Sequence, residues 1–122
     1  MKILIILQKW EGGVGVVVRN IKKGLENKGH KVDVIARQDD LRISSFLDSF
    51  SKLRKLVKQK GKEYDIIYTQ DWSTTLPFLF PSHLFKEKHF CCFHGIQPGF
   101  AFILQKITGR FMGKNLIVVG DS

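Results

Sequence analysis

The stretch Trp10-Glu11-Gly12-Gly13-Val14-Gly15 decides how this sequence is interpreted. It lies between the apolar run Ile3 to Leu7, which is typical of a buried strand, and a segment of helical periodicity. Glycines let a backbone approach a ligand closely, and the first turn of a helix has unpaired N–H groups and a partial positive charge. The unit therefore predicts an anion site suited to phosphate or pyrophosphate, with a plain strand-to-helix turn as the alternative.

Short apolar runs recur along the chain and alternate with helix-period segments. The runs are Ile3–Leu7, Val32–Ala36, Ile66–Thr69, Phe90–Phe93 and Leu116–Val119. Continuous apolar strands are typical of a parallel sheet covered on both faces, and the alternation indicates repeated right-handed βαβ units. We predict a Rossmann-like, three-layer α/β/α domain whose sheet has about five parallel strands in the order 3-2-1-4-5.

Helices are predicted between these strands. The expected segments are Gly15 to Lys28, Ser44 to Lys60, Thr74 to His83, and a segment that follows Pro98-Gly99. In the first segment, apolar residues at helical spacing form one buried face, and Gly29 suits the position just past the helix end.

The predicted crevice lies between the first and fourth strands, because ligands of such sheets bind beyond the carboxyl ends where the strand order reverses. Gly12, Gly13 and Gly15 belong to the loop after the first strand, and His94 and Gly95 follow the fourth. His94 is therefore placed to bond a sugar hydroxyl or a phosphate. A loop histidine that caps a backbone group would have the same position.

Gln70-Asp71-Trp72 follows the third strand, near the rim of this crevice. An indole stacks on the apolar face of a sugar, while amide and carboxylate groups bond hydroxyls, so the three residues suit a carbohydrate. The alternative is that Asp71 caps a helix beside a partly buried Trp72. His30 and His89 precede strands at the opposite end of the sheet, where we expect surface residues.

The net charge of +9 is concentrated in places along the 122 residues. One acid-free group consists of Lys52, Arg54, Lys55, Lys58, Lys60 and Lys62. Such a patch favours an anionic membrane surface, whereas the alternative is a solvated helix face. A nucleic-acid partner is not expected, because base-stacking aromatic residues do not interleave with the cations.

Several functional classes are disfavoured by the sequence. Cys91 and Cys92 are neighbours in a strand, so they point to opposite faces and read as buried, reduced thiols. The isolated histidines give no metal-ligand spacing, and Val18 replaces the third glycine of the dinucleotide fingerprint, although Arg37 would suit a 2′-phosphate. No run approaches the roughly 20 apolar residues that span a bilayer, so we expect a cytoplasmic protein, at most peripheral to a membrane.

In order and spacing, these segments resemble the N-terminal domain of family 4 glycosyltransferases, which have the GT-B fold. The matching stretches are Gly12–Gly15, Gly24–Val34, Tyr64–Trp72, Phe93–Gly95 and Asn115–Ser122. The resemblance implies a retaining, metal-independent transfer of a sugar from a nucleotide-sugar substrate, such as a UDP- or GDP-sugar, to an acceptor, with no cofactor.

The resemblance also implies roles for the residues at the crevice. Gly12, Gly13 and Gly15 would approach the donor phosphates and sugar, and His94 would be the catalytic group beside the transferred sugar. The implied acceptor-binding residues are Gln70, Asp71, Trp72 and Gly95. The chain departs from the family at Tyr68 and Gln70, where family members often have histidines.

The donor-binding C-terminal domain of these enzymes has no counterpart in the sequence. We therefore expect residues 1–122 to form one domain, the acceptor-side half of an enzyme, inactive alone and dependent on a separate donor-binding domain. The alternatives are a non-catalytic binding module or a split-enzyme subunit, and less favoured are a nucleic-acid-binding or NAD(P)-binding domain. Apolar surface left where further elements would dock leads us to expect a homo-oligomer.

Overall fold

The computed structural model describes residues 1–38, 46–70, 72–79, 82–94 and 99–119. The strands are β1 (Lys2–Leu7), β2 (Lys31–Ala36), β3 (Ile66–Gln70), β4 (His89–His94) and β5 (Leu116–Val119). The helices are α1 (Gly13–Asn27), α3 (Phe46–Lys60), α4 (Trp72–Leu79) and α5 (Phe100–Met112), with 3₁₀ turns η1 (Gly61–Glu63) and η2 (Gly113–Asn115). This alternation confirms the predicted α/β class, and each strand and α-helix begins within a few residues of its predicted start, whereas the two 3₁₀ turns were not predicted.

All five strands are parallel in a single sheet whose order is β2-β1-β3-β4-β5. The sheet is consistent with a Rossmann-like fold, but the predicted order 3-2-1-4-5 is wrong, because β3 pairs with β1 and not with β2. The reason lies in β2, which carries Lys31 and Asp33 and is half-buried over Asp33 to Ile35. Charged side chains suit an edge strand, whereas β1 is buried from Ile3 to Leu7 and needs a neighbour on each side.

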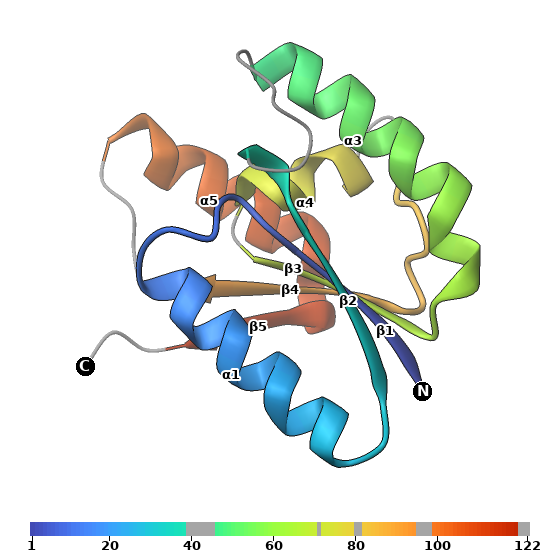
Figure 1. The fold of residues 1–122 in the computed structure, drawn as a ribbon. Helices are drawn as coiled ribbons and strands as arrows, with labels where there is room; N and C mark the ends of the chain where they lie inside the picture. Colours follow the sequence, from blue (N-terminus) through green and yellow to red (C-terminus); the bar gives the residue numbers. More distant parts are fainter. Residues whose placement is uncertain (39–45, 71, 80–81, 95–98, 120–122) are drawn as a thin grey trace.

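The helices divide unequally between the two faces of the sheet (Figure 1). On one face, Val18 and Ile21 of α1 pack over Ile3 and Ile5 of β1. On the other face, α3 packs over β1 and β3, while α4 and α5 pack over β4. The two faces differ because successive side chains of a strand point to opposite faces of the sheet. In β1, odd-numbered residues point to α1 and even-numbered ones to α3.

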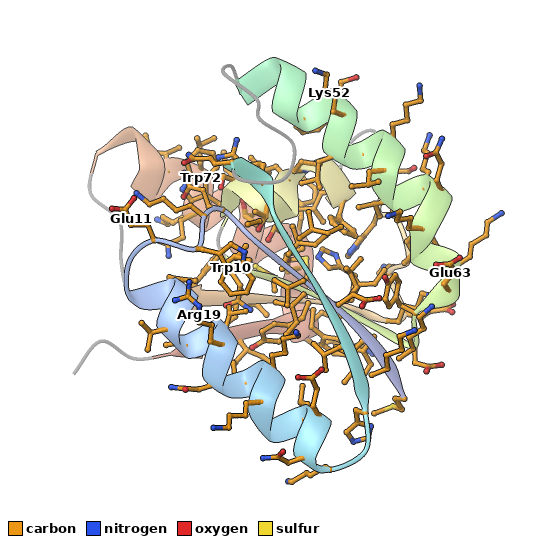
Figure 2. The ribbon with its side chains drawn as sticks, viewed as in Figure 1. Trp10, Glu11, Arg19, Lys52, Glu63 and Trp72 are labelled. Carbon is orange, nitrogen blue, oxygen red and sulfur yellow. The ribbon has the colours of Figure 1, made fainter. Side chains whose placement is uncertain are left out.

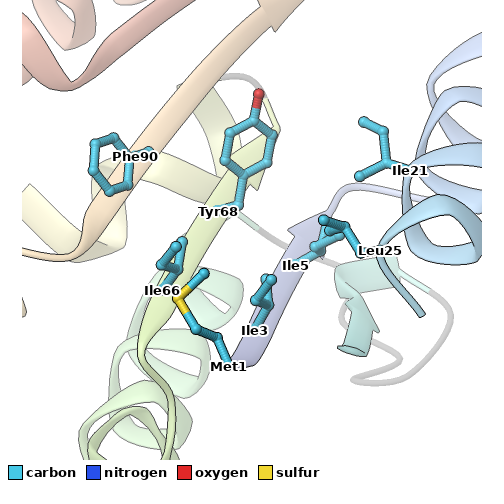
Figure 3. A pocket seen from close by; sticks show the side chains of 8 residues that line it. All are labelled: Met1, Ile3, Ile5, Ile21, Leu25, Ile66, Tyr68 and Phe90. Atoms are coloured by element: carbon cyan, nitrogen blue, oxygen red, sulfur yellow. The ribbon is translucent and has the colours of Figure 1, made fainter. Parts of the chain in front are cut away.

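Among the described helices, only α1 covers the α1 face of the sheet (Figure 1). An apolar cavity of about 320 Å³ lies there, with Tyr68 and Phe90 on one side and Ile21 and Leu25 of α1 on the other (Figure 3). Its remaining lining residues are Met1, Ile3, Ile5 and Ile66. On the same face of β5, Ile117 is 43% exposed. The structure thus has exposed apolar surface on the α1 face of the sheet.

A buried polar network lies beneath α4 on the opposite face. His89 is fully buried, so the expectation of a surface residue is wrong, because α4 and the segment that follows it cover the start of β4. Its Nε2 atom lies 2.9 Å from Oγ1 of Thr69, which lies 2.8 Å from Oγ1 of Thr75. The Thr75 hydroxyl donates to Sγ of Cys91 at 3.0 Å. Both cysteines are free and buried, as predicted.

The described helices also bear on membrane topology. Within the part of the chain that the structure describes, no helix has the length and hydropathy needed to cross a bilayer.

Candidate functional site

The glycine loop connects β1 to α1 at the carboxyl end of the sheet. Its start is tied to the end of β2, because the backbone N–H of Gln38 donates to the carbonyl oxygen of Gln8 at 2.8 Å. Gly12 is the N-cap of α1 and has φ of 101°, in the left-handed region that favours glycine. A strand end and a helix start therefore hold the loop in place from both sides.

The three glycines of the loop have different roles. A Cβ atom added to Gly15 would lie 1.7 Å from the carbonyl oxygen of Trp10, so Gly15 allows the first turn of α1 to touch the loop. A Cβ atom on Gly12 or Gly13 would meet nothing within 4 Å. Gly15 is therefore a packing residue, whereas Gly12 and Gly13 border open space where a ligand has room.

That open space is a cavity of about 190 Å³ at the N-terminus of α1. It is lined by Gln8, Lys9, Glu11, Gly12, Gly13 and Val14. No side chain caps the helix at Gly12, and its first turn has no acidic residue, so backbone N–H groups remain available to an anion. The ammonium group of Lys9 suits a phosphate, while the carboxylate of Glu11 suits a hydroxyl donor. The cavity thus combines groups for both halves of a sugar phosphate.

Trp10 anchors the loop on the side away from this cavity. Its ring packs into the cluster formed by α1 and β1, and the guanidinium carbon of Arg19 lies 4.9 Å from the ring centroid. Figure 2 shows Trp10 and Arg19 together over α1, with Glu11 directed outward. The indole is therefore held against α1, and its neighbours in the sequence, Lys9 and Glu11, line the cavity where they can contact a ligand.

The observed strand order moves the ligand crevice. The order reverses between β1 and β3, so the predicted crevice between the first and fourth strands is wrong, since β3 occupies that place. The carboxyl end of β3 therefore lies beside the end of β1, from which the glycine loop starts. His94 ends β4, two strands from β1, at roughly 10 Å because neighbouring strands are about 4.8 Å apart.

The predicted sugar-binding residues occupy different environments. Gln70 ends β3 with no exposed surface, and its carbonyl oxygen accepts a 2.8 Å hydrogen bond from Thr74. Trp72 is half-buried at the start of α4 and packs on the apolar cluster beneath α4 and α5. Gln70 therefore belongs to the core and not to the rim. Asp71, Gly95 and the side chain of His94 lie outside what the structure describes.

The basic group on α3 and η1 is smaller than predicted. Its exposed members are Lys52, Lys55, Lys58, Lys60 and Lys62. Arg54 was expected among them but is 8% exposed, because the spacing of α3 turns it toward α4. Its guanidinium donates to the carbonyl oxygens of Pro77 and Ser82 at 2.9 and 3.0 Å. Arg54 is thus a structural residue that joins α3 to the end of α4.

The sequence analysis gave binding roles only to the glycines of this loop, although Gln8, Lys9 and Glu11 also line the cavity. Their position directly beyond the end of β1 was the available signal, because residues there line the crevice in this architecture. Among the described residues, no group of three His, Cys, Asp or Glu side chains is placed to hold a metal ion. Neither the models of protein families nor the curated proteins with which the chain was compared match it.

Proposed function

We propose that this chain is the acceptor-side domain of a retaining glycosyltransferase that moves a sugar from a UDP- or GDP-sugar to an acceptor without a metal ion. The observation that carries the proposal is the cavity at the N-terminus of α1. It offers backbone N–H groups and Lys9 to a phosphate, and Glu11 to a sugar hydroxyl. The resemblance to family 4 enzymes, carried by the order of the matching segments, supports the same assignment.

In this proposal, the glycine loop binds the donor phosphates and His94 acts in catalysis. The amides at Gly12 and Gly13, together with Lys9, hold the phosphates of the donor. His94, at the end of β4, stands about 10 Å from the end of β1, a distance that a hexose and its phosphate span. There it stabilises the charge that develops as the glycosidic bond breaks. The nucleotide is held by a donor-binding domain, so this chain alone is inactive.

A non-catalytic binding module is the second candidate, and the burial of Gln70 favours it. One of the residues expected to contact an acceptor has no exposed surface. A domain that binds a sugar phosphate without presenting an acceptor would have this arrangement. Such a module would keep the glycine-loop cavity and need no role for His94.

Ligand binding is tested by recording backbone amide NMR spectra during titration with UDP-glucose, GDP-mannose and pyrophosphate. We expect a nucleotide-sugar to shift the amides of Gln8 to Val14, and Gly13→Glu to abolish these shifts by placing a carboxylate in the cavity. Gly24→Glu is the matched control, because Gly24 also has open space around its Cβ position but lies on the second half of α1. Equal shifts with pyrophosphate alone would mean that the loop binds anions without recognising the sugar or the nucleotide.

Catalysis is tested separately, with the protein together with its donor-binding domain. We expect His94→Ala to lower sugar transfer by about 100-fold or more while leaving the amide shifts at the glycine loop unchanged. Donor binding with unaltered transfer in His94→Ala would favour the binding module over the enzyme.

A further inference from the structure

The outer side of α5 carries an exposed apolar stripe. Ile103, Ile107 and Phe111 are 52%, 40% and 56% exposed. Residues four apart lie on one side of a helix, so these side chains form one line about 12 Å long. Thr108 and Met112 are buried on the opposite side of α5, against the sheet. The stripe therefore lies on the solvent-exposed side of α5.

Only positive charges accompany this stripe. Lys106 and Arg110 are exposed on the same side of α5 and border, with Ile103 and Ile107, a shallow cavity of about 350 Å³. Lys114 is exposed in η2, one turn further on. The sequence contains no acidic residue between Glu87 and Asp121. An apolar stripe bordered by cations is typical of helices that lie in the interface of an anionic membrane.

Helix α3 carries further exposed cations on the same face of the sheet. The residues Leu53 and Val57 of α3 pack on the sheet, so Lys52 and Lys55 point away from it. Helices α3 and α5 flank the buried helix α4 on one face of the sheet (Figure 1). The exposed lysines of α3 thus add positive charge on the face of the sheet that α5 also covers.

We propose that the outer side of α5 docks on an anionic lipid bilayer, with Ile103, Ile107 and Phe111 inserted among the headgroups. Lys106, Arg110 and Lys114 meet the phosphates around them, and the lysines of α3 add to the electrostatic attraction. A lipid surface fits better than a nucleic acid, because a polyanion without an apolar layer would leave the stripe in water. The surface is separate from the glycine-loop cavity, so the inference does not depend on the proposed enzymatic function.

Co-sedimentation of the chain with vesicles tests this docking. We expect binding to phosphatidylcholine vesicles that contain phosphatidylglycerol, and little binding to phosphatidylcholine alone. Ile103→Ser with Phe111→Ser should weaken the partition by about tenfold or more, and so should Lys106→Gln with Arg110→Gln. Val16→Ser with Val17→Ser is the matched control, because it removes exposed apolar side chains from α1 and should bind as the wild type does. Thermal unfolding of each variant verifies that the fold is intact.

Three outcomes would overturn the proposal. Equal binding to both kinds of vesicle would show that the anionic headgroups are not recognised. Wild-type binding by Ile103→Ser with Phe111→Ser, with a loss in Lys52→Gln with Lys55→Gln, would mean charge attraction without insertion of α5. Binding of an oligonucleotide without any vesicle binding would assign the surface to nucleic acid instead.

Discussion

The Nε2 atom of His83 lies 2.9 Å from the Nδ1 atom of His89, so one imidazole donates a hydrogen bond to the other. His89 is fully buried, and its ring stacks on Phe78 at a centroid distance of 4.2 Å. Burial, with a smaller contribution from the charge of His83, lowers the pKa of His89 to about 3. Burial and then the nearby charge of Lys86 also lower the pKa of His83. The folded protein therefore keeps this pair of rings neutral.

We expect the protein to lose stability as the pH falls below 6.5, the ordinary pKa of histidine, since the pKa of His89 in the fold is about 3. Between these values the unfolded chain binds a proton that the folded chain excludes. The stabilisation by neutral His89 is thus complete above the unfolded pKa and is lost progressively toward the folded one. The loss amounts to about 1 kcal/mol between pH 6 and pH 5, measured by urea denaturation.

His89→Phe is the control for this pH dependence. It keeps an aromatic ring against Phe78 but removes the titrating group, so its stability should vary less with pH. Its stability at neutral pH should be lower, because Thr69 and His83 each lose a hydrogen-bond partner. A pH profile parallel to that of the wild type would show that other groups cause the acid sensitivity.

Gly15→Ala should destabilise the protein by about 1–3 kcal/mol, because the new methyl group would collide with the Trp10 carbonyl oxygen. Gly13→Ala is the matched substitution in the same loop. Its methyl group meets open space, so its stability should equal or slightly exceed that of the wild type. Thermal unfolding of the two variants measures the difference, and equal melting temperatures would contradict the close approach at Gly15.

Arg54→Leu should destabilise the protein by about 2–4 kcal/mol, since the carbonyl oxygens of Pro77 and Ser82 would lose a charged donor. Lys55→Leu removes the next cation of α3 at an exposed position and should change stability by less than about 0.5 kcal/mol. Urea denaturation of the pair separates the buried cation from the exposed one. Similar losses in both variants would mean that net charge, and not the buried contact, matters.

The open apolar face beside α1 should cause self-association of the chain. Ile117→Lys places a charge on this face and should shift sedimentation-velocity profiles toward the monomer. Val16→Lys adds the same charge to an exposed apolar position on the outer side of α1, and it should leave the profiles unchanged. A monomeric wild-type chain at high concentration would rule out this surface as a self-association site.

The strands and helices were predictable because each has a local signal. The unbroken apolar run of β1 and the helical spacing of Val18, Ile21 and Leu25 depend on neighbours in the sequence alone. The order of the strands was not predicted, although Lys31 and Asp33 marked β2 as an edge strand. Strand order depends on which strands can lie at the edge of the sheet and which need a neighbour on both sides. The predicted order was taken from dinucleotide-binding sheets, and the charges of Lys31 and Asp33 were not considered.

The candidate site was predicted in part. The loop with Gly12 and Gly13 and its cavity lie where the strand–loop–helix pattern indicated. The burial of Arg54 and His89 was missed, because polar residues are normally exposed and their partners are distant in the sequence. Arg54 is stabilised by carbonyl groups beyond Leu76, and His89 by Thr69 on a neighbouring strand. Such tertiary partners leave no periodic signal.

Helix α4 differs from the other helices in that every residue from Ser73 to Leu79 is buried. It has Pro77 in its interior and therefore lacks one backbone donor, which makes an isolated helix unstable. Its neighbours α3 and α5 enclose it, and Arg54 holds the carbonyl oxygen of Pro77. We therefore expect α4 to acquire its helical structure late in folding, after the two flanking helices have docked on the sheet.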